Sequence, residues 1–229
     1  MRAAILGLAT SLLAGNALAA DYLRGSNYEP PAAGYRWTGV YIGGQVGYSE
    51  ANATFGATAS TIPQVGATWM QLPGASAHGI TYGGFVGYNA QWGDVVLGVE
   101  GNYNHMSLRA VSAGVVSGTD TYGGFGRLTD VMTFRGRAGY AMGWLMPYAF
   151  VGLAIGRLDT ERSATIPPDT YVQRHNGNYS IGFAAGGGVD MGLTQNLFLR
   201  AEYEFVHLTN VRGVTAITNT VRGGAGLKF

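Results

Sequence analysis

Residues 40–49 of the chain, VYIGGQVGYS, decide the fold class. Apolar or aromatic side chains occupy alternate positions at Val40, Ile42, Val46 and Tyr48, and small or polar residues lie between them. Successive side chains of a β-strand point to opposite faces, so this alternation predicts a strand whose two faces meet different surroundings. One face is apolar, and the other is narrow and polar.

The same alternation returns in seven later segments of the chain. It is blurred over 146–158, where both faces are apolar. It is clear near 80–92, 95–104, 132–140, 180–190, 197–205 and 220–229. Strands of about 9–11 residues are long enough for a tilted crossing of a membrane. We therefore expect eight membrane-crossing strands.

The gaps between these segments alternate in length. Three gaps are tight, at 92–94, 143–144 and 193–195. Four are long and rich in Gly, Ser, Thr, Pro and Asn, at about 50–78, 106–129, 159–177 and 209–216. An even strand count with turns of unequal length at the two ends is typical of outer-membrane barrels. The sequence thus predicts an all-β fold, an eight-stranded antiparallel transmembrane β-barrel with short periplasmic turns and long, mobile extracellular loops.

The composition excludes several other classes of protein. Glycine accounts for 38 of 229 residues, and an interior glycine costs a helix about 1 kcal/mol. Hydrophobic residues make up 47% of the chain, far above the content of disordered proteins, while mean hydropathy is only +0.09, too low for a bundle of membrane helices. Fourteen basic and 13 acidic residues form no basic run, so we expect no nucleic-acid partner. Cysteine is absent, so disulfides contribute nothing to stability.

Two alternative folds compete with the barrel. Residues 138–156 form a stretch of 19 residues without charge, long enough for a membrane helix, but Pro147 and several glycines favour a hairpin that turns at 143–144. A soluble sandwich or lipocalin-like barrel would turn its apolar face inward. In this sequence the charges lie on the narrow face of the strands, which favours the membrane barrel.

Aromatic residues are expected in two girdles, one at each membrane surface. The girdle at the short-turn end is predicted to contain Trp37, Trp92, Trp144 and Phe229. The girdle at the long-loop end is predicted to contain Tyr48, Tyr82, Tyr103 and Tyr203.

Four acids and four arginines lie on the narrow face, which a membrane barrel turns toward its lumen. They are Glu100, Arg135, Arg137, Asp190, Arg200, Glu202, Glu204 and Arg222. Neighbouring strands carry opposite signs, and the interior of an eight-stranded barrel is only wide enough for side chains. We interpret the set as a neutral lattice of ion pairs that plugs the lumen. The alternative is a narrow selective pore.

The beginning of the chain resembles a targeting segment. Residues 1–19 combine a basic start, a short apolar stretch and the small-residue ending Ala17-Leu18-Ala19, which is typical of a cleaved signal peptide. A buried helix or a membrane anchor is the alternative. Residues 20–36 contain Pro30-Pro31 and no sustained period, which predicts a periplasmic tether. The barrel domain is then expected to cover 37–229.

The motifs of catalytic and cofactor sites are not evident in the sequence. The histidines His78, His105, His175 and His207 have no metal-ligand spacing. The glycine run 186–188 is not followed by the helix and lysine of a phosphate-binding loop. We therefore expect no cofactor, no metal and no enzymatic activity.

A family resemblance appears along residues 37–229. The stretches that carry it are WTGVYIGGQVGY, YGGFVGYNAQW, VLGVEGNY, TFRGRAGYA, MPYAFVGLAIG, NLFLRAEYEFVHL and VRGGAGLKF. In this order they resemble the small outer-membrane β-barrel proteins of alphaproteobacteria, which include abundant surface antigens of brucellae and porin-like proteins. The resemblance implies eight strands and contact with outer-membrane lipid and lipopolysaccharide. Phe229 looks like the signal read by the barrel-assembly machinery, although Leu227 stands where an aromatic residue is common.

The resemblance implies no single activity, because family members are described as structural, porin-like, haem-binding or adhesive. Some members begin with Ala-Asp after signal cleavage and are joined to peptidoglycan through that amine. Cleavage after Ala19 leaves the same start, so Ala20 and Asp21 are the candidate attachment site, with an unattached tail as the alternative. We expect a structural protein that contributes to envelope integrity. A small porin, or loops that bind haem or a host surface, are the other hypotheses, and the sequence specifies no oligomeric state.

Overall fold

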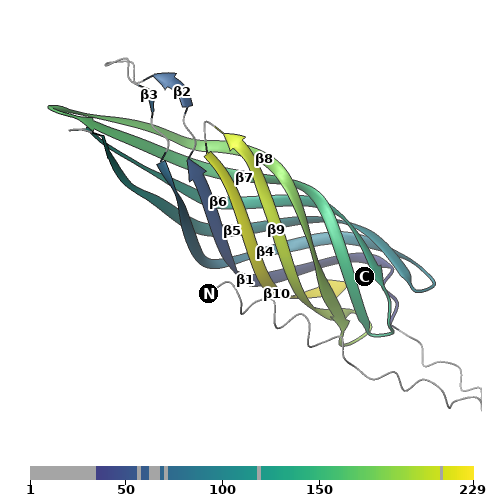
Figure 1. Cartoon of the computed structure of the whole chain (residues 1–229). Coiled ribbons are helices and arrows are strands. Elements are labelled where there is room, and N and C mark those ends of the chain that lie inside the picture. Colours follow the sequence, from purple (N-terminus) through teal and green to yellow (C-terminus); the bar gives the residue numbers. More distant parts are fainter. Residues whose placement is uncertain (1–34, 56–57, 62–67, 70–71, 118–119, 212–213) are drawn as a thin grey trace, which may run out of the picture. The chain divides into compact units, whose positions relative to one another are not determined.

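The computed structural model describes residues 35–55, 58–61, 68–69, 72–117, 120–211 and 214–229. Eight strands close into an antiparallel barrel in which chain neighbours pair and β1 closes the ring against β10 (Figure 1). The barrel strands are β1 (Gly39–Phe55), β4 (Leu72–Trp92), β5 (Val95–Ser117), β6 (Asp120–Tyr140), β7 (Leu145–Ile166), β8 (Asp169–Gly192), β9 (Leu197–Val211) and β10 (Val214–Lys228). Two short strands between β1 and β4, β2 (Thr58–Thr61) and β3 (Thr68–Trp69), form a separate sheet. The predicted eight-stranded antiparallel barrel is confirmed.

The tight turns lie where the sequence placed them. The β4–β5 turn occupies 93–94 and the β6–β7 turn 143–144, and both begin with a glycine in the left-handed region, with φ of 59° at Gly93 and 65° at Gly143. The stretch 138–156 is therefore a hairpin. None of the described residues belongs to a helix long and apolar enough to span a membrane.

The strands are longer than expected, at 15 to 24 residues. The predicted long loops at 106–129 and 159–177 are wrong, because β5, β6, β7 and β8 continue through most of those residues. The loops predicted at 50–78 and 209–216 are likewise shortened by strand residues at both ends. The reason is that the alternation of inward and outward side chains persists beyond the membrane. On β5 it persists through buried Met106, Leu108 and Ala110.

The apolar face of each strand points outward. On β1, for example, Val40, Ile42 and Val46 are about half exposed, while Tyr41 and Gln45 between them are buried. The segment 146–158 is apolar on both faces: Val151 and Leu153 point outward, whereas Met146, Tyr148 and Phe150 point inward. This outward apolar surface is what a membrane barrel requires.

The interior is layered along the barrel axis. At the short-turn end it is filled by an aromatic cluster, Tyr35, Trp37, Tyr41, Phe85, Val96, Ala141, Met146, Tyr148, Phe150 and Phe198. Charged and then polar side chains follow toward the long-loop end. Beyond them lies an apolar layer that includes Met106, Leu108, Leu128, Leu158 and Leu208.

The predicted aromatic girdles are correct with one exception. Trp92, Trp144 and Phe229 are exposed at the short-turn end, whereas Trp37 is only 2% exposed and lies inside the barrel. Trp37 precedes β1, so strand alternation does not determine its direction, and it follows the chain into the barrel mouth. At the long-loop end, all four predicted tyrosines are exposed: Tyr48, Tyr82, Tyr103 and Tyr203. The predicted signal peptide and all of the tether except Tyr35 and Arg36 lie outside the described residues.

Candidate functional site: a charge network inside the barrel

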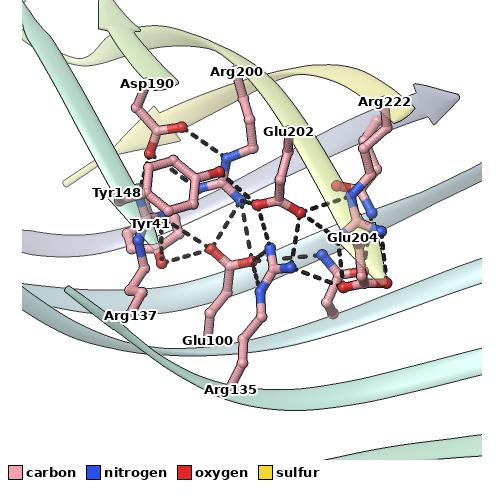
Figure 2. Close-up of polar contacts among 12 residues, drawn as sticks. Tyr41, Glu100, Arg135, Arg137, Tyr148, Asp190, Arg200, Glu202, Glu204 and Arg222 are labelled. Atoms are coloured by element: carbon pink, nitrogen blue, oxygen red, sulfur yellow. Dashed lines mark hydrogen bonds and ion pairs between the residues drawn. The ribbon is translucent and has the colours of Figure 1, made fainter. Parts of the chain in front are cut away.

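The eight charged residues singled out in the sequence all lie inside the barrel. Each is at most 5% exposed. Their side chains converge on one another across the lumen (Figure 2). Five strands supply them, namely β5, β6, β8, β9 and β10.

Three ion pairs join residues that face each other on neighbouring strands. The register places Glu100 opposite Arg135, Asp190 opposite Arg200 and Glu202 opposite Arg222. In each pair the arginine Nε donates to the acid, at 3.1, 2.8 and 2.8 Å respectively. The opposite charges carried by neighbouring strands in the sequence predict these same three pairs of strands.

Other ion pairs cross the lumen between strands that are not neighbours. Arg135 on β6 donates from Nη1 to Glu202 on β9 at 2.8 Å and to Glu204 at 3.0 Å. Arg200 on β9 donates from Nη1 to Glu100 on β5 at 2.8 Å. These pairs depend on the curvature of the closed sheet, so the strand order alone does not predict them.

Three further contacts, made by Arg137 and Arg222, complete the network. Arg137 donates from Nη2 to Asp190 at 2.6 Å and from Nη1 to Glu100 at 3.2 Å. Arg222 donates from Nη1 to Glu204 at 3.2 Å. Four acids and four arginines thus form one connected, formally neutral cluster. Charges buried without partners cost several kcal/mol each, and here every charge is paired.

Aromatic side chains surround the network. The sequence prediction of the interior included only the charged residues and not these rings. The guanidinium carbons of Arg135, Arg137 and Arg200 lie over aromatic rings, 4.0, 3.8 and 4.0 Å from the ring centroids. The rings belong to Phe150, Tyr148 and Phe85, in that order. Cation–π contacts of this kind stabilise desolvated arginines.

Two tyrosine hydroxyls also serve the network. Tyr41 donates to Glu100 at 2.7 Å, and Tyr148 donates to Glu202. A sequence signal for these inward rings exists: glycines stand opposite them. A Cβ added at Gly87 would overlap the Tyr41 ring, so the glycine makes room for it. With Tyr41, Phe85 and Tyr148 included, all eight barrel strands contribute to the site.

The segment before β1 closes the short-turn end of the lumen. The Trp37 amide donates to Gln91 Oε1 at 2.8 Å, and its indole Nε1 donates to the carbonyl of Gly143 at 3.3 Å. Its ring lies 4.4 Å from that of Tyr35, centroid to centroid. Burial, and to a smaller degree the charge of Asp190, raises the pKa of Tyr35 to about 12, so this phenol stays neutral. The network is therefore capped by aromatic rings at the short-turn end of the barrel.

Comparison with known proteins identifies the family. The model of the outer membrane protein beta-barrel domain matches residues 7–229. This chain belongs to the outer membrane protein β-barrel family. The 31 kDa outer-membrane immunogenic protein of Brucella melitensis is 31% identical over 256 residues, which cover the whole of both chains. The 22 kDa outer membrane protein of Rhizobium leguminosarum bv. viciae is 28% identical over 205 residues, covering 84% of this chain and 78% of the relative.

Among solved structures, neisserial surface protein A matches 84% of this chain and 98% of its own, with 17% identity and a TM-score of 0.42. The resemblance noted in the sequence is confirmed by the family match and the curated relatives. Membership of the outer membrane protein β-barrel family places the protein in the outer membrane of a Gram-negative cell. The interior network is then a feature of the membrane-spanning part of the barrel.

The remaining predicted sites lie apart from the network. Ala20 and Asp21 are outside the described residues. Phe229 is 75% exposed, and its amide donates to the Val40 carbonyl at 2.9 Å, which joins the chain end to β1. His105 Nδ1 lies 2.9 Å from Asp130 on the outer surface. Within the part of the chain that the structure describes, no group of three His, Asp or Glu residues is arranged to hold a metal ion.

Proposed function

We propose that this protein is a non-enzymatic structural barrel that closes its own lumen and contributes to the integrity of the outer membrane. The observation that carries the proposal is the filled interior. Eight paired charges and a cluster of aromatic rings occupy the lumen, and the interior charges are at most 5% exposed. A barrel of this size has little interior space beyond its own side chains.

A closed lumen suits a structural protein because it adds no leak to the membrane. The ion pairs link strands that are not neighbours, such as β5 to β9 and β6 to β9. Such cross-links oppose separation of the two halves of the sheet. The network therefore supports both closure and mechanical coupling of the barrel.

The competing hypothesis is a small porin, and conductance separates the two. Purified wild-type protein is inserted into planar bilayers and single-channel currents are recorded. We expect no steady conductance of porin size, because the network and Trp37 occupy the passage. Steady open-channel current from the wild type would refute the structural proposal and favour a porin.

The contribution to integrity is tested in cells. A strain that lacks the protein is expected to leak periplasmic enzymes and to become sensitive to detergent. Wild-type protein and an Arg135→Met variant that reaches the membrane in equal amount are then compared for rescue. Equal envelope integrity with and without the wild-type protein would contradict the proposal.

We propose further that the mature N-terminus is joined to peptidoglycan at Ala20, with Asp21 as the recognition residue beside it. The described part of the chain supports this in one respect. Trp37 contacts the β6–β7 turn at Gly143, so the chain enters the barrel at the periplasmic end. The residues that precede it extend up to about 3.3 Å each, or roughly 50 Å for the predicted tether of 20–36.

Muramidase digestion of purified sacculi followed by mass spectrometry tests the attachment. A peptide that begins at Ala20 and carries a muropeptide is the expected product in a strain with the needed transpeptidase. The Asp21→Asn variant is expected to give the same barrel in the membrane with less of the linked peptide. Recovery of only unlinked N-termini would rule out the tether and leave the barrel proposal intact.

A further inference from the structure

The outer surface of the barrel carries a polar depression above the membrane band. It has a volume of about 430 Å³. Strands β5, β6, β7 and β8 line it with Ser107, Arg109, Phe125, Arg127, Glu161 and Arg174. Three arginines and one glutamate thus surround a space that faces outward, separate from the interior network.

Two of these arginines lie directly opposite each other. The register pairs Arg109 on β5 with Arg127 on β6, and both side chains point to the outside. Like charges opposite each other on neighbouring strands are destabilising. An anion placed between the two guanidinium groups would relieve this repulsion.

The two described acids nearest this pair bind other groups. Glu161 accepts from Arg174 Nε at 2.7 Å. Asp159, opposite Arg127 on β7, accepts the amide of Gly177 at 2.6 Å. Within the described residues neither Arg109 nor Arg127 has a carboxylate within ion-pair distance.

Neutral contacts fix the two guanidinium groups instead. Arg127 Nη2 donates to the Ser107 hydroxyl at 3.0 Å. The guanidinium carbon of Arg109 lies 4.7 Å from the centroid of the Phe125 ring. Both cations are therefore held at the rim of the depression with hydrogen-bond donors to spare, since a guanidinium has five.

The height of the depression identifies the source of the anion. On β5 the last exposed aromatic residue is Tyr103, whose hydroxyl donates to Asp130 at 2.7 Å, and Ser107 and Arg109 lie four and six positions beyond it. With a rise of about 3.3 Å per residue and a strand tilt of about 40°, they lie roughly 10–15 Å above the aromatic row. In an outer membrane this level holds the phosphorylated sugars of the outer leaflet.

We propose that a phosphate group of lipopolysaccharide binds between Arg109 and Arg127, with Arg174 at the opposite side of the depression. Planar guanidinium groups bind phosphate oxygens in a bidentate manner. The phosphate neutralises the opposed pair, and its lipid chains lie along the apolar surface below. The site gives the barrel a defined lipid partner at strands β5–β8. It does not depend on whether the lumen is closed.

The test measures lipid binding to the purified, folded protein in detergent. The probes are lipid A with both phosphates and the same lipid A after enzymatic removal of the phosphates, and native mass spectrometry gives the occupancy. The variant is the double substitution Arg109→Ala and Arg127→Ala. Its matched control is Arg36→Ala, which removes an exposed arginine at the opposite end of the barrel.

We expect the wild type and the Arg36→Ala control to bind phosphorylated lipid A about tenfold more tightly than the dephosphorylated lipid. The double variant is expected to lose most of that preference. A preserved tenfold preference in the double variant would overturn the proposal. So would displacement of lipid A by an equal concentration of inorganic phosphate, which would indicate a general anion site.

A second variant covers the case in which the alanine pair does not fold, as judged by gel mobility without heating. The double substitution to lysine keeps both charges but loses the bidentate geometry. It is expected to retain a preference for phosphorylated lipid A that is weaker than that of the wild type. Equal binding of phosphorylated and dephosphorylated lipid A by the lysine double variant would also refute the site.

Discussion

Substitution of Arg135 by methionine tests the interior network most directly. Arg135 donates five hydrogen bonds, to Glu100, Glu202 and Glu204. Methionine fills a similar volume without a charge, so the variant leaves one negative charge in excess inside the barrel. Removal of one partner from a buried ion pair typically costs about 3–5 kcal/mol. The remaining arginines still contact all three acids, so we expect a loss of about 3 kcal/mol, at the lower end of that range.

The assay is urea unfolding of the barrel in lipid vesicles, followed by tryptophan fluorescence and by gel mobility without heating. Arg157→Met is the matched control, because Arg157 is exposed on the outside and its loss is expected to change stability by no more than about 0.5 kcal/mol. The double variant Arg135→Met and Glu202→Gln restores neutrality. We expect it to be more stable than the sum of the two single effects, by at least about 1 kcal/mol.

A sealed lumen requires that the network be buried and its members coupled, and two results would contradict this. A loss below about 1 kcal/mol for Arg135→Met would mean that water reaches the network and screens it. Additive single and double effects would mean that Arg135 and Glu202 do not form a coupled pair, contrary to the 2.8 Å contact between them. Either result would remove the basis for a sealed lumen.

Three further predictions concern closure and assembly. Trp37→Ala deletes a buried aromatic ring and is expected to cost about 3–5 kcal/mol in urea unfolding, still with no channel current because the charges remain; unchanged stability would contradict its role as a cap. Deletion of Phe229 is expected to lower the amount of folded barrel in the outer membrane while synthesis continues, measured by gel mobility of membrane fractions; an unchanged amount would argue against an assembly signal. A Cβ at Gly186 would overlap the Phe150 ring, so Gly186→Val is expected to reduce folded yield severely, whereas Gly136→Val, with no atom near the added Cβ, is expected to fold; equal yields would refute the space argument.

The sequence predicts the fold well because the physical signal is local. Alternation assigns each side chain of β1 to a face, and the tight turns at Gly93 and Gly143 are marked by residues that suit them. The same alternation assigns the charged residues to the interior. Opposite signs on neighbouring strands indicate adjacent pairs such as Glu100 and Arg135, which lie opposite each other in the structure.

Other features depend on the closed shape and are not encoded locally. The contact of Arg200 with Glu100 spans the lumen, and it exists because closure brings β9 near β5. Trp37 lies before the first strand, so its entry into the barrel follows from the aromatic pocket at Phe198 and Tyr35 and not from alternation. The lengths of the strands were underestimated because the thickness of the membrane sets the length only of the part of each strand that crosses it.

The interior and exterior of the barrel change polarity at the same height, and this locates the outer membrane surface. On β5, below Tyr103, the outward side chains are apolar while Glu100 and Asn102 face the lumen. Above it Ser107 and Arg109 face outward and Leu108 faces inward, while Val111 is still 60% exposed. An outer surface in contact with lipid favours the first arrangement and an outer surface in contact with water the second, because apolar side chains avoid water. The change between Tyr103 and Arg109 therefore marks the boundary where the headgroups lie.

Spin labels on β5 test the position of this boundary. Labels at positions 99 and 101 are expected to be reached by oxygen dissolved in the lipid, and a label at position 111 by a water-soluble relaxation agent. Equal access to the water-soluble agent along the whole strand would refute the boundary, and with it the placement of the phosphate site.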